Sequence, residues 1–189
     1  MNKIIITAPI VLAILIGACQ QKKDVWSNEQ GVTDAKAAND SSFTDRSEEN
    51  DADFVVNTIA GNWAEIKMAQ LAKNKSGNAD IQSAAGKLEE QHMKMITELR
   101  AYADKKGIAI PLEETNRDAN ELADLDQETS QEFDEAWCKQ MRQRHEKSIR
   151  RFEARGKRTD EQELREWINA TLPELKAHLD IIESVQNER

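Results

Sequence analysis

Three histidines are the side chains of this sequence best suited to chemistry, and each lies in the middle of a different apolar stripe. His92, His145 and His178 are each flanked by apolar residues at three- and four-residue spacing. That spacing marks the face that an amphipathic helix turns towards its neighbours. Imidazole nitrogens need partners when they are buried. Three inward-facing histidines therefore predict a polar or metal-binding centre inside a helical bundle.

A carboxylate extends this candidate centre to a fourth helix. Glu65 lies on the inward side of an expected helix, in a row with Gly61 and Ala72, whose small size leaves room for it. The candidate metal ligands are then Glu65, His92, His145 and His178, one from each helix. This set is rich in histidine and poor in carboxylate, so a divalent ion such as zinc or nickel, or a copper ion, suits it better than a pair of irons.

Accessory ligands can be named one turn from the candidates. Glu89 stands three residues before His92, which is one of the two Glu-x-x-His motifs of ferritin-like di-iron proteins, but Leu175 stands where the second glutamate is needed. Di-iron oxygen chemistry is therefore not expected. Three methionines also lie one turn from a candidate ligand, namely Met68, Met95 and Met141. Soft sulfur ligands select copper(I), although methionine is also a common filler of apolar cores.

The alternative interpretation is that these are core histidines with separate hydrogen bonds. Counting about 1.5 Å per residue from the expected turns places Glu65 and His92 within about one turn of the same height. The same count places His178 about two turns deeper than His145. A single four-ligand centre then needs a break at Pro173 or an uneven turn. Otherwise the histidines pair separately, for example His92 with Glu65.

The elements that must position these residues are four long helices. The first is expected from Asp51 or Asp53 to about Lys73, and the second from a cap at Asn78 or Asp80 to Lys106. Capping boxes at Thr129-x-x-Glu132 and Thr159-x-x-Gln162 open the third and fourth helices, and the third ends near Gly156. The connection 107–128 is long and contains Pro111, with one short helix expected over 117–125. The predicted fold is all-α, a ferritin-like four-helix bundle with a long crossover; the alternative is an up-down bundle with an elaborated loop.

The amino terminus predicts export and lipid attachment. Lys3 is followed by the apolar run 4–16, which is too short to span a bilayer as a helix. The run closes on Ile16-Gly17-Ala18-Cys19, which resembles a bacterial lipobox. Residues 1–18 are thus expected to be a signal peptide, with an acylated Cys19 holding the protein on a membrane. The alternative, an uncleaved membrane anchor, is disfavoured by Pro9 and by the length of the run.

Composition divides the remaining chain and limits its partners. Residues 19–51 are polar and predict a flexible tether, and 52–189 form one domain by size. The net charge of −9 argues against nucleic acid as a partner. Basic residues do crowd the third helix, and a salt-bridged solvated face is favoured there over an anion-binding patch. Cys138 lies in that same helix without evident oxyanion donors, so nucleophilic catalysis has little support.

Several short motifs together resemble a known family. They are Ala64-Glu65-Ile66 followed by Leu71-Ala72, His92 with Lys94, His145-Glu146-Lys147 with Phe152, and Thr171-Leu172-Pro173 leading to His178-Leu179. Over about residues 52–186 they look like domain-of-unknown-function family 4142, whose members are ferritin-like bacterial envelope proteins often labelled as outer membrane proteins. The resemblance implies the fold and assigns no reaction.

The predicted function combines these observations. The chain is expected to be a lipid-anchored protein of the bacterial cell envelope, and Gln20 after Cys19 favours the outer membrane, facing the periplasm. It is expected to be a binding or stress-related module rather than an enzyme, with no specific protein partner or small ligand indicated. The alternative is a metalloenzyme, or a metal-storage or metal-handling protein, that uses the same histidines.

Overall fold

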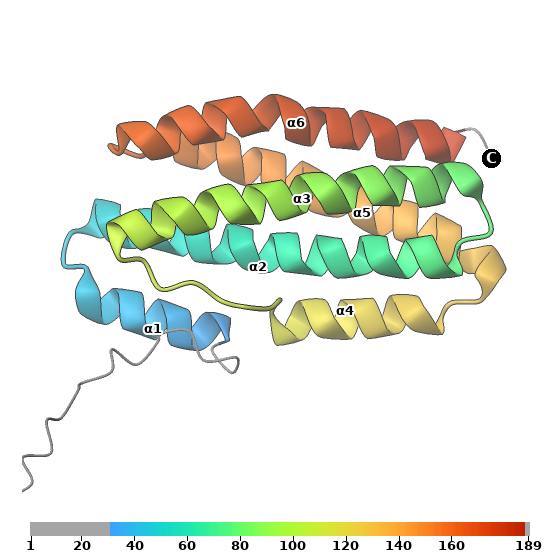
Figure 1. The fold of residues 1–189 in the computed structure, drawn as a ribbon, viewed down its shortest axis with the longest axis horizontal. Coiled ribbons are helices and arrows are strands. Elements are labelled where there is room, and N and C mark those ends of the chain that lie inside the picture. The colour runs from blue at the N-terminus through green and yellow to red at the C-terminus, as the bar shows by residue number, and fades with distance from the viewer. Residues whose placement is uncertain (1–30, 188–189) are drawn as a thin grey trace, which may run out of the picture.

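The computed structural model describes residues 31–187, and this part of the chain is all-helical. Its helices are α1 (Val32–Ser42), α2 (Arg46–Lys75), α3 (Ala79–Lys106), α4 (Asn116–Gln127), α5 (Ser130–Gly156) and α6 (Gln162–Asn187) (Figure 1). The expected all-α class is confirmed. Across the described residues, none of these helices combines the length and apolar character that a membrane crossing requires.

The four long helices lie side by side (Figure 1). α2 packs along α3, α5 packs along α6, and the two pairs meet through α2 against α5 and α3 against α6. A short turn makes α2 and α3 antiparallel. Residues 107–115 and α4 then carry the chain back along the bundle, so α5 runs in the same direction as α3 (Figure 1). α4 packs against α2 and α5, which places it over the groove between them.

Local sequence signals set most helix ends. The Asn78 side chain accepts hydrogen bonds from the first turn of α3, and Thr129 does the same for α5, as expected. Gly107 closes α3 in the left-handed region, with φ of 68°, where a side chain would be strained. One expectation was wrong: α2 begins at Arg46, not at Asp51 or Asp53, because the Asp45 side chain caps it.

The turn between α5 and α6 differs from the expected capping box. Thr159 Oγ1 accepts from the N–H of Glu161 rather than from that of Gln162. The same hydroxyl donates to a buried carboxylate of α2, Asp51, at 2.9 Å. Arg155 Nε donates to Asp51 as well, at 2.7 Å. The turn is therefore anchored on α2, and α6 begins only at Gln162.

Part of the expected tether is folded. α1 and the first turns of α2 occupy residues 32–51, and Ala35 and Val56 form a small apolar cluster with Ala109. The Asn39 amide donates to the Ala109 carbonyl at 3.0 Å and accepts from its N–H at 2.7 Å. Composition does not predict this helix, because α1 is docked largely by the hydrogen bonds of one polar side chain, Asn39, to the backbone of Ala109. Residues 1–30, which include the expected signal peptide and Cys19, lie outside the described residues.

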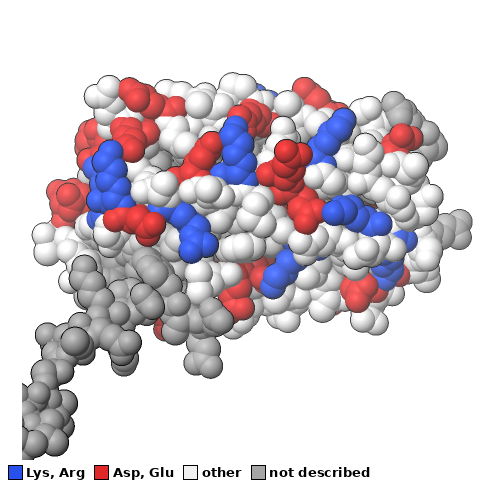
Figure 2. Space-filling model, in the orientation of Figure 1, with Lys and Arg blue, Asp and Glu red and all other residues white. Residues whose placement is uncertain are grey.

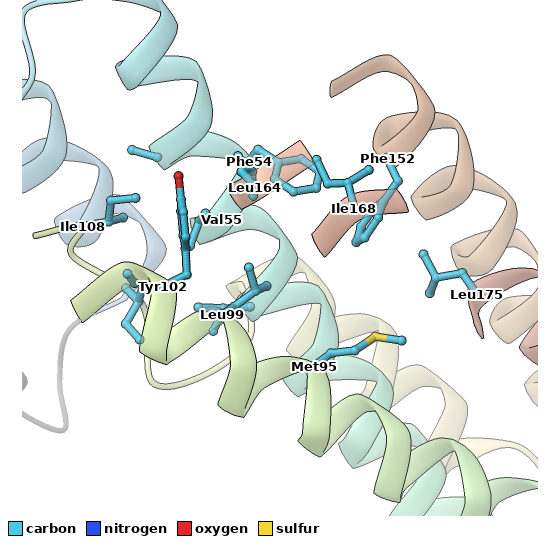
Figure 3. Packing of buried hydrophobic residues seen from close by; sticks show 14 residues of the cluster. Phe54, Val55, Met95, Leu99, Tyr102, Ile108, Phe152, Leu164, Ile168 and Leu175 are labelled. Atoms are coloured by element: carbon cyan, nitrogen blue, oxygen red, sulfur yellow. The ribbon is translucent and has the colours of Figure 1, made fainter. Parts of the chain in front are cut away.

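The core of the bundle consists of two apolar clusters, one towards each end. The first contains Phe54, Met95, Leu99, Phe152, Leu164, Ile168 and Leu175 (Figure 3). The second contains Met68, Leu88, Phe133, Trp137, Met141 and Ile182. On every long helix, one of the four candidate ligands lies between residues of the two clusters. A buried polar layer thus separates the two halves of the core.

Candidate metal centre

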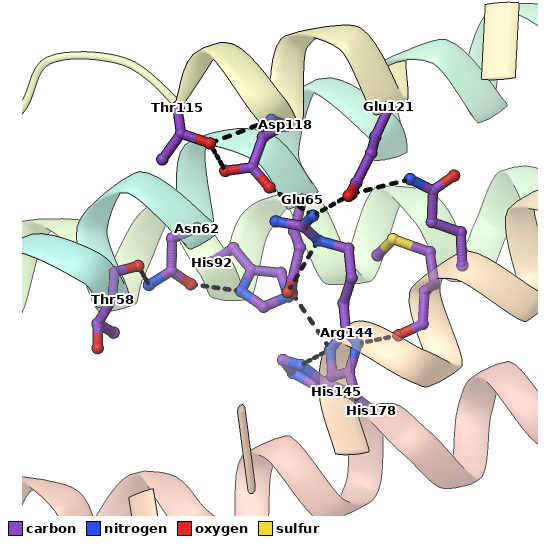
Figure 4. Close-up of polar contacts among 12 residues, drawn as sticks. Thr58, Asn62, Glu65, His92, Thr115, Asp118, Glu121, Arg144, His145 and His178 are labelled. Atoms are coloured by element: carbon purple, nitrogen blue, oxygen red, sulfur yellow. Dashed lines mark hydrogen bonds and ion pairs between the residues drawn. The ribbon is translucent and has the colours of Figure 1, made fainter. Parts of the chain in front are cut away.

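The three histidines meet in this polar layer (Figure 4). Ring centroids lie 5.3 Å apart for His92 and His145, 5.0 Å for His92 and His178, and 5.3 Å for His145 and His178. Each histidine offers one nitrogen such that all three nitrogens lie within 4.8 Å of one another. All three rings are buried. The convergence expected from the stripes is therefore present in the fold.

Glu65 completes the layer from α2. Its Oε2 lies 2.9 Å from Nε2 of His92 and 3.6 Å from Nε2 of His145. The Glu65 residue is only 4% exposed, so its carboxylate is removed from water. One ligand-type side chain from each long helix thus enters the polar layer, where Glu65 approaches His92 and His145, and His178 contacts His145.

An uneven turn brings His178 level with His145. After α5 ends at Gly156, the chain continues to coil, because the N–H of Thr159 donates to the Arg155 carbonyl at 2.9 Å. The turn therefore extends beyond the end of α5 along the bundle axis, and α6 begins from there at Gln162 and runs antiparallel to α5. α6 is helical through Pro173, so of the two alternatives the uneven turn is the one present, and the helix does not break at Pro173.

Asn62 fixes the orientation of His92. The Asn62 amide nitrogen donates to the Thr58 carbonyl at 2.9 Å, so its oxygen is the acceptor that faces the ring. Nδ1 of His92 then donates to that oxygen at 2.6 Å. Nε2 is the remaining ring nitrogen, and it points to Glu65 without the geometry of a hydrogen bond.

His145 has the same tautomer for a similar reason. Its Nδ1 donates to the Met141 carbonyl at 2.9 Å, which leaves Nε2 as an acceptor. Nδ1 of His178 donates to that Nε2 at 3.2 Å, and Nε2 of His178 has no hydrogen-bond partner. Two of the three rings are therefore oriented by protein carbonyl oxygens, with the opposite nitrogen directed into the centre.

The charge states follow from burial and from the neighbouring groups. Burial raises the pKa of the Glu65 carboxyl, but His145, His92 and Arg144 lower it by more, so its pKa lies well below the usual range. Burial lowers the pKa of His145, and it lowers the pKa of His178 to about 3. At neutral pH the centre therefore contains an ionised carboxylate beside at least two neutral imidazoles.

Arg144 connects the centre to α4 (Figure 4). Its Nε lies 3.6 Å from Oε1 of Glu65, and its NH1 group donates to Asp118 at 2.7 Å and to Glu121 at 3.1 Å. Thr115 donates to the other oxygen of Asp118 at 2.5 Å. α4 thus covers the outer side of Glu65, and the expectation that Arg144 belongs to a solvated face was wrong.

The accessory ligands are less well placed. Glu89 binds Lys73 and Gln70 at the surface, so it does not belong to the centre. Met68 and Met141 pack in the second apolar cluster. Met95 belongs to the first cluster and also lines a small cavity beside His92.

Sequence reasoning did not single out Asn62 or the inward role of Arg144. Asn62 stands one turn before Glu65 on the buried side of α2. This spacing is the sequence feature that could have indicated an amide beside the carboxylate. Arg144 directly precedes His145 and could be assigned to the centre only once the position of α4 was known.

Comparison with known families assigns the chain to a family. Residues 33–185 match the family model described as "Domain of unknown function (DUF4142)". The chain belongs to the DUF4142 family. No curated protein and no solved structure gives a match. The DUF4142 match begins at residue 33, near the start of α1, so it includes the helices that were expected to be tether.

The geometry of this DUF4142 centre can be compared with that of a metal site. Ligand atoms about 2.0–2.2 Å from a tetrahedral zinc ion are about 3.3–3.5 Å from one another. The three short separations in the centre are 2.9, 3.2 and 3.6 Å. The three histidine nitrogens lie within 4.8 Å of one another, so the side chains would have to draw closer together to bind one tetrahedral ion.

Proposed function

We propose that this protein is a metal-binding module of the bacterial cell envelope, built on a ferritin-like four-helix bundle. One divalent ion would be held in the buried layer by Glu65, His92, His145 and His178. The proposal concerns binding of the ion, as in metal storage or handling, and includes no catalytic step.

The observation that carries the proposal is the orientation of the two rings. Nδ1 of His92 and Nδ1 of His145 each donate to a protein oxygen, at 2.6 and 2.9 Å, and both Nε2 atoms face Glu65. Metal-binding histidines usually donate their other ring N–H in this way, which fixes the tautomer and raises the basicity of the ligand. Core histidines whose ring nitrogens only hydrogen-bond to one another do not require a carboxylate shared between them.

The donor set favours zinc, and after it nickel or copper(II). Three imidazoles and one carboxylate are ligands of intermediate hardness, which these ions prefer. Among the described residues, Glu65 is the carboxylate that contacts the histidines of this layer, whereas a ferritin-like di-iron site uses four carboxylates. Because Met68 and Met141 pack in the apolar cluster, copper(I) is the less favoured ion.

The envelope location comes from the amino terminus. The lipobox-like Ile16-Gly17-Ala18-Cys19 supports acylation at Cys19, with the helical bundle carried outside the membrane. The long crossover formed by residues 107–115 and α4, which leaves α3 and α5 parallel, supports the ferritin-like topology (Figure 1).

Zinc titration of the full chain, purified without a histidine tag and stripped with chelator, tests metal binding. Because the chain contains only three histidines, imidazole ligation can come only from this centre. Calorimetry should show one tight site per chain, and thermal melting should show stabilisation that grows with the logarithm of free zinc. Absence of a tight site for zinc, nickel and copper(II) would reject the proposal.

Variants locate the ion. His145→Ala and His178→Ala should each lose the tight site. Glu89→Gln is the matched control, because Glu89 stands one turn from His92 but pairs with Lys73 at the surface. It should bind like the parent protein. Equal zinc affinity in all three variants would place the ion elsewhere.

Labelling with a fatty acid tests the anchor. The parent protein should incorporate label and fractionate with membranes, and Cys19→Ala should lose both properties. Label retained in Cys19→Ala would contradict the lipid-anchor part of the proposal without affecting the metal centre.

A further inference from the structure

A cleft of about 530 Å³ opens between α2, α4 and α5, beside the metal centre. Its volume is in the range of small-molecule sites. A second, much smaller cavity of about 10 Å³ shares Gly61, Glu65, Ser148 and Arg151 with the cleft and extends to His92. The cleft is therefore the solvent side of the same polar layer.

The lining of this cleft is positive in a chain that is negative overall. Its charged side chains are Arg117, Lys139, Arg144, Lys147 and Arg151, against Glu65, Asp118 and Glu121. All three carboxylates are paired with Arg144. Lys139, Lys147 and Arg151 have no carboxylate within 4.0 Å among the described residues. The net charge of the chain is −9, so this local excess of cations is unusual.

Arg151 is the most informative of these cations. Its NH2 group makes two long hydrogen bonds of 3.4 Å, to the Asn57 carbonyl and to Thr58 Oγ1. Its Nε is buried without a hydrogen-bond partner, and its guanidinium lies 6.0 Å from the Phe54 ring centroid. A guanidinium withdrawn from water is normally paired with an anion. Glu65 and Asp118 attract Arg151 electrostatically, but no carboxylate among the described residues lies within 4.0 Å of it, so its guanidinium can still pair with an anion that enters the cleft.

The outer surface offers a contrast. Acidic and basic side chains are interspersed over the face shown in Figure 2, without a broad patch of one sign. Cations on α5 outside the cleft are paired in the ordinary way, for example Arg150 with Glu146 at 4.0 Å. The unpaired positive charge of α5 is thus concentrated in a cleft, which favours a small ligand over an extended polyanion.

We propose that this cleft is a binding site for a small molecule that carries an oxyanion group, a carboxylate or a phosphate. The guanidinium of Arg151 would hold two oxygens of the anion, since its planar fork matches carboxylate and phosphate geometry. Lys147, which lines the same cleft one turn before Arg151, would supply a second positive charge. The proposal stands on the cleft and its charges and does not require the metal.

Calorimetric titration of the metal-free full chain with inorganic phosphate, and separately with succinate, tests this site. At least one of the two anions should bind once per chain, and the comparison identifies which oxyanion the cleft prefers. Arg151→Met keeps an unbranched apolar side chain against Phe54 and should weaken binding by at least about tenfold, because a charged hydrogen-bond donor is lost. Arg150→Met, its chain neighbour, should bind within about twofold of the parent protein.

Gly61→Leu tests the cleft without changing its charge. A Cβ at Gly61 meets nothing within 4 Å, so Gly61→Leu would place an apolar side chain in the cleft wall and should weaken anion binding while the protein stays folded. Failure of both anions to bind the parent protein would overturn the proposal, as would equal binding by Arg151→Met. Binding that appears only after zinc loading and survives Arg151→Met would assign the anion to the metal and also overturn it. Anion binding by a chain that binds no zinc would support this site and reject only the metal centre.

Discussion

Asn62 accepts a hydrogen bond of 2.6 Å from Nδ1 of His92, and this single contact decides which nitrogen of the ring faces Glu65. The amide is itself held by the Thr58 carbonyl one turn earlier, at 2.9 Å. Two successive hydrogen bonds along α2 therefore orient a side chain of α3. The proposed metal centre would depend on such orienting contacts as much as on the four candidate ligands, because a ring that can rotate loses its preorganisation.

Removing the Asn62 acceptor should weaken metal binding without unfolding the protein. Asn62→Ala is expected to reduce zinc affinity by about 10- to 100-fold, the usual cost of losing a contact that orients a metal ligand. Asn62→Asp keeps an acceptor oxygen and should retain affinity. Asn50→Ala is the control, because Asn50 makes the same kind of bond to the fourth residue before it but is exposed. Zinc affinity that is unchanged in Asn62→Ala would contradict the orienting role.

Gly61 and Gly107 should respond oppositely to alanine. Gly61 lies inside α2 with open space at its Cβ position, so Gly61→Ala should stabilise the fold by about 0.5–1 kcal/mol through helix propensity. Gly107 has φ of +68°, so Gly107→Ala should destabilise it by about 1 kcal/mol. Urea unfolding of the two variants measures both effects. Destabilisation by Gly61→Ala would show that the cleft wall beside Gly61 is closed.

Asn39 should be essential for docking α1. Asn39→Leu leaves the N–H and carbonyl of Ala109 without their partner, at an expected cost of about 1–3 kcal/mol. Limited proteolysis should then cut within 32–45 much faster than in the parent protein. Asp40→Ala, at the exposed neighbouring position, should leave the cleavage rate unchanged. Rapid cleavage of this segment in the parent protein would mean that it is the tether expected from composition.

The metal-free protein should lose stability in mild acid. Burial lowers the pKa of His178 from 6.5 to about 3, with His92 and His145 also lowering it and Glu65 raising it. Between these two pH values the unfolded chain binds a proton that the folded chain does not, so the free energy of unfolding rises with pH over this window. Urea unfolding from pH 4 to 7 should show this slope, and His178→Phe should reduce it. An unchanged slope in that variant would contradict the buried neutral state of His178.

The stripes of the sequence predict the four residues of the polar layer because inward-facing positions depend only on helical periodicity. The positions of these four residues along the bundle axis depend on the turns between the helices, which periodicity does not describe. Thr159 and Arg155 bind Asp51 on another helix, and this long-range contact sets the start of α6 and the level of His178. The outward position of Glu89 has a related cause, since Lys73 and Gln70 of α2 pair with it at the surface, and the Glu-x-x-His spacing does not describe such contacts between helices.

The polar contacts that refine the site required the fold. Asn39 and Asn62 have little local signal, because an asparagine is as common in exposed turns as in a buried amide pairing. Arg144 and Arg151 belong to a basic stretch that sequence alone favours as solvated. Only the position of α4 over the groove between α2 and α5 shows that these two arginines point inward.

Anomalous diffraction from crystals of the zinc-loaded full chain tests the central claim most directly. We expect one strong anomalous peak per chain in the layer between the two apolar clusters, with His92, His145, His178 and Glu65 at about 2.0–2.2 Å from it. The rings of His92 and His145 should keep their bonds to Asn62 and to the Met141 carbonyl. No peak in this layer, or zinc only at surface carboxylates, would contradict the account and leave the three histidines as buried hydrogen-bonding residues.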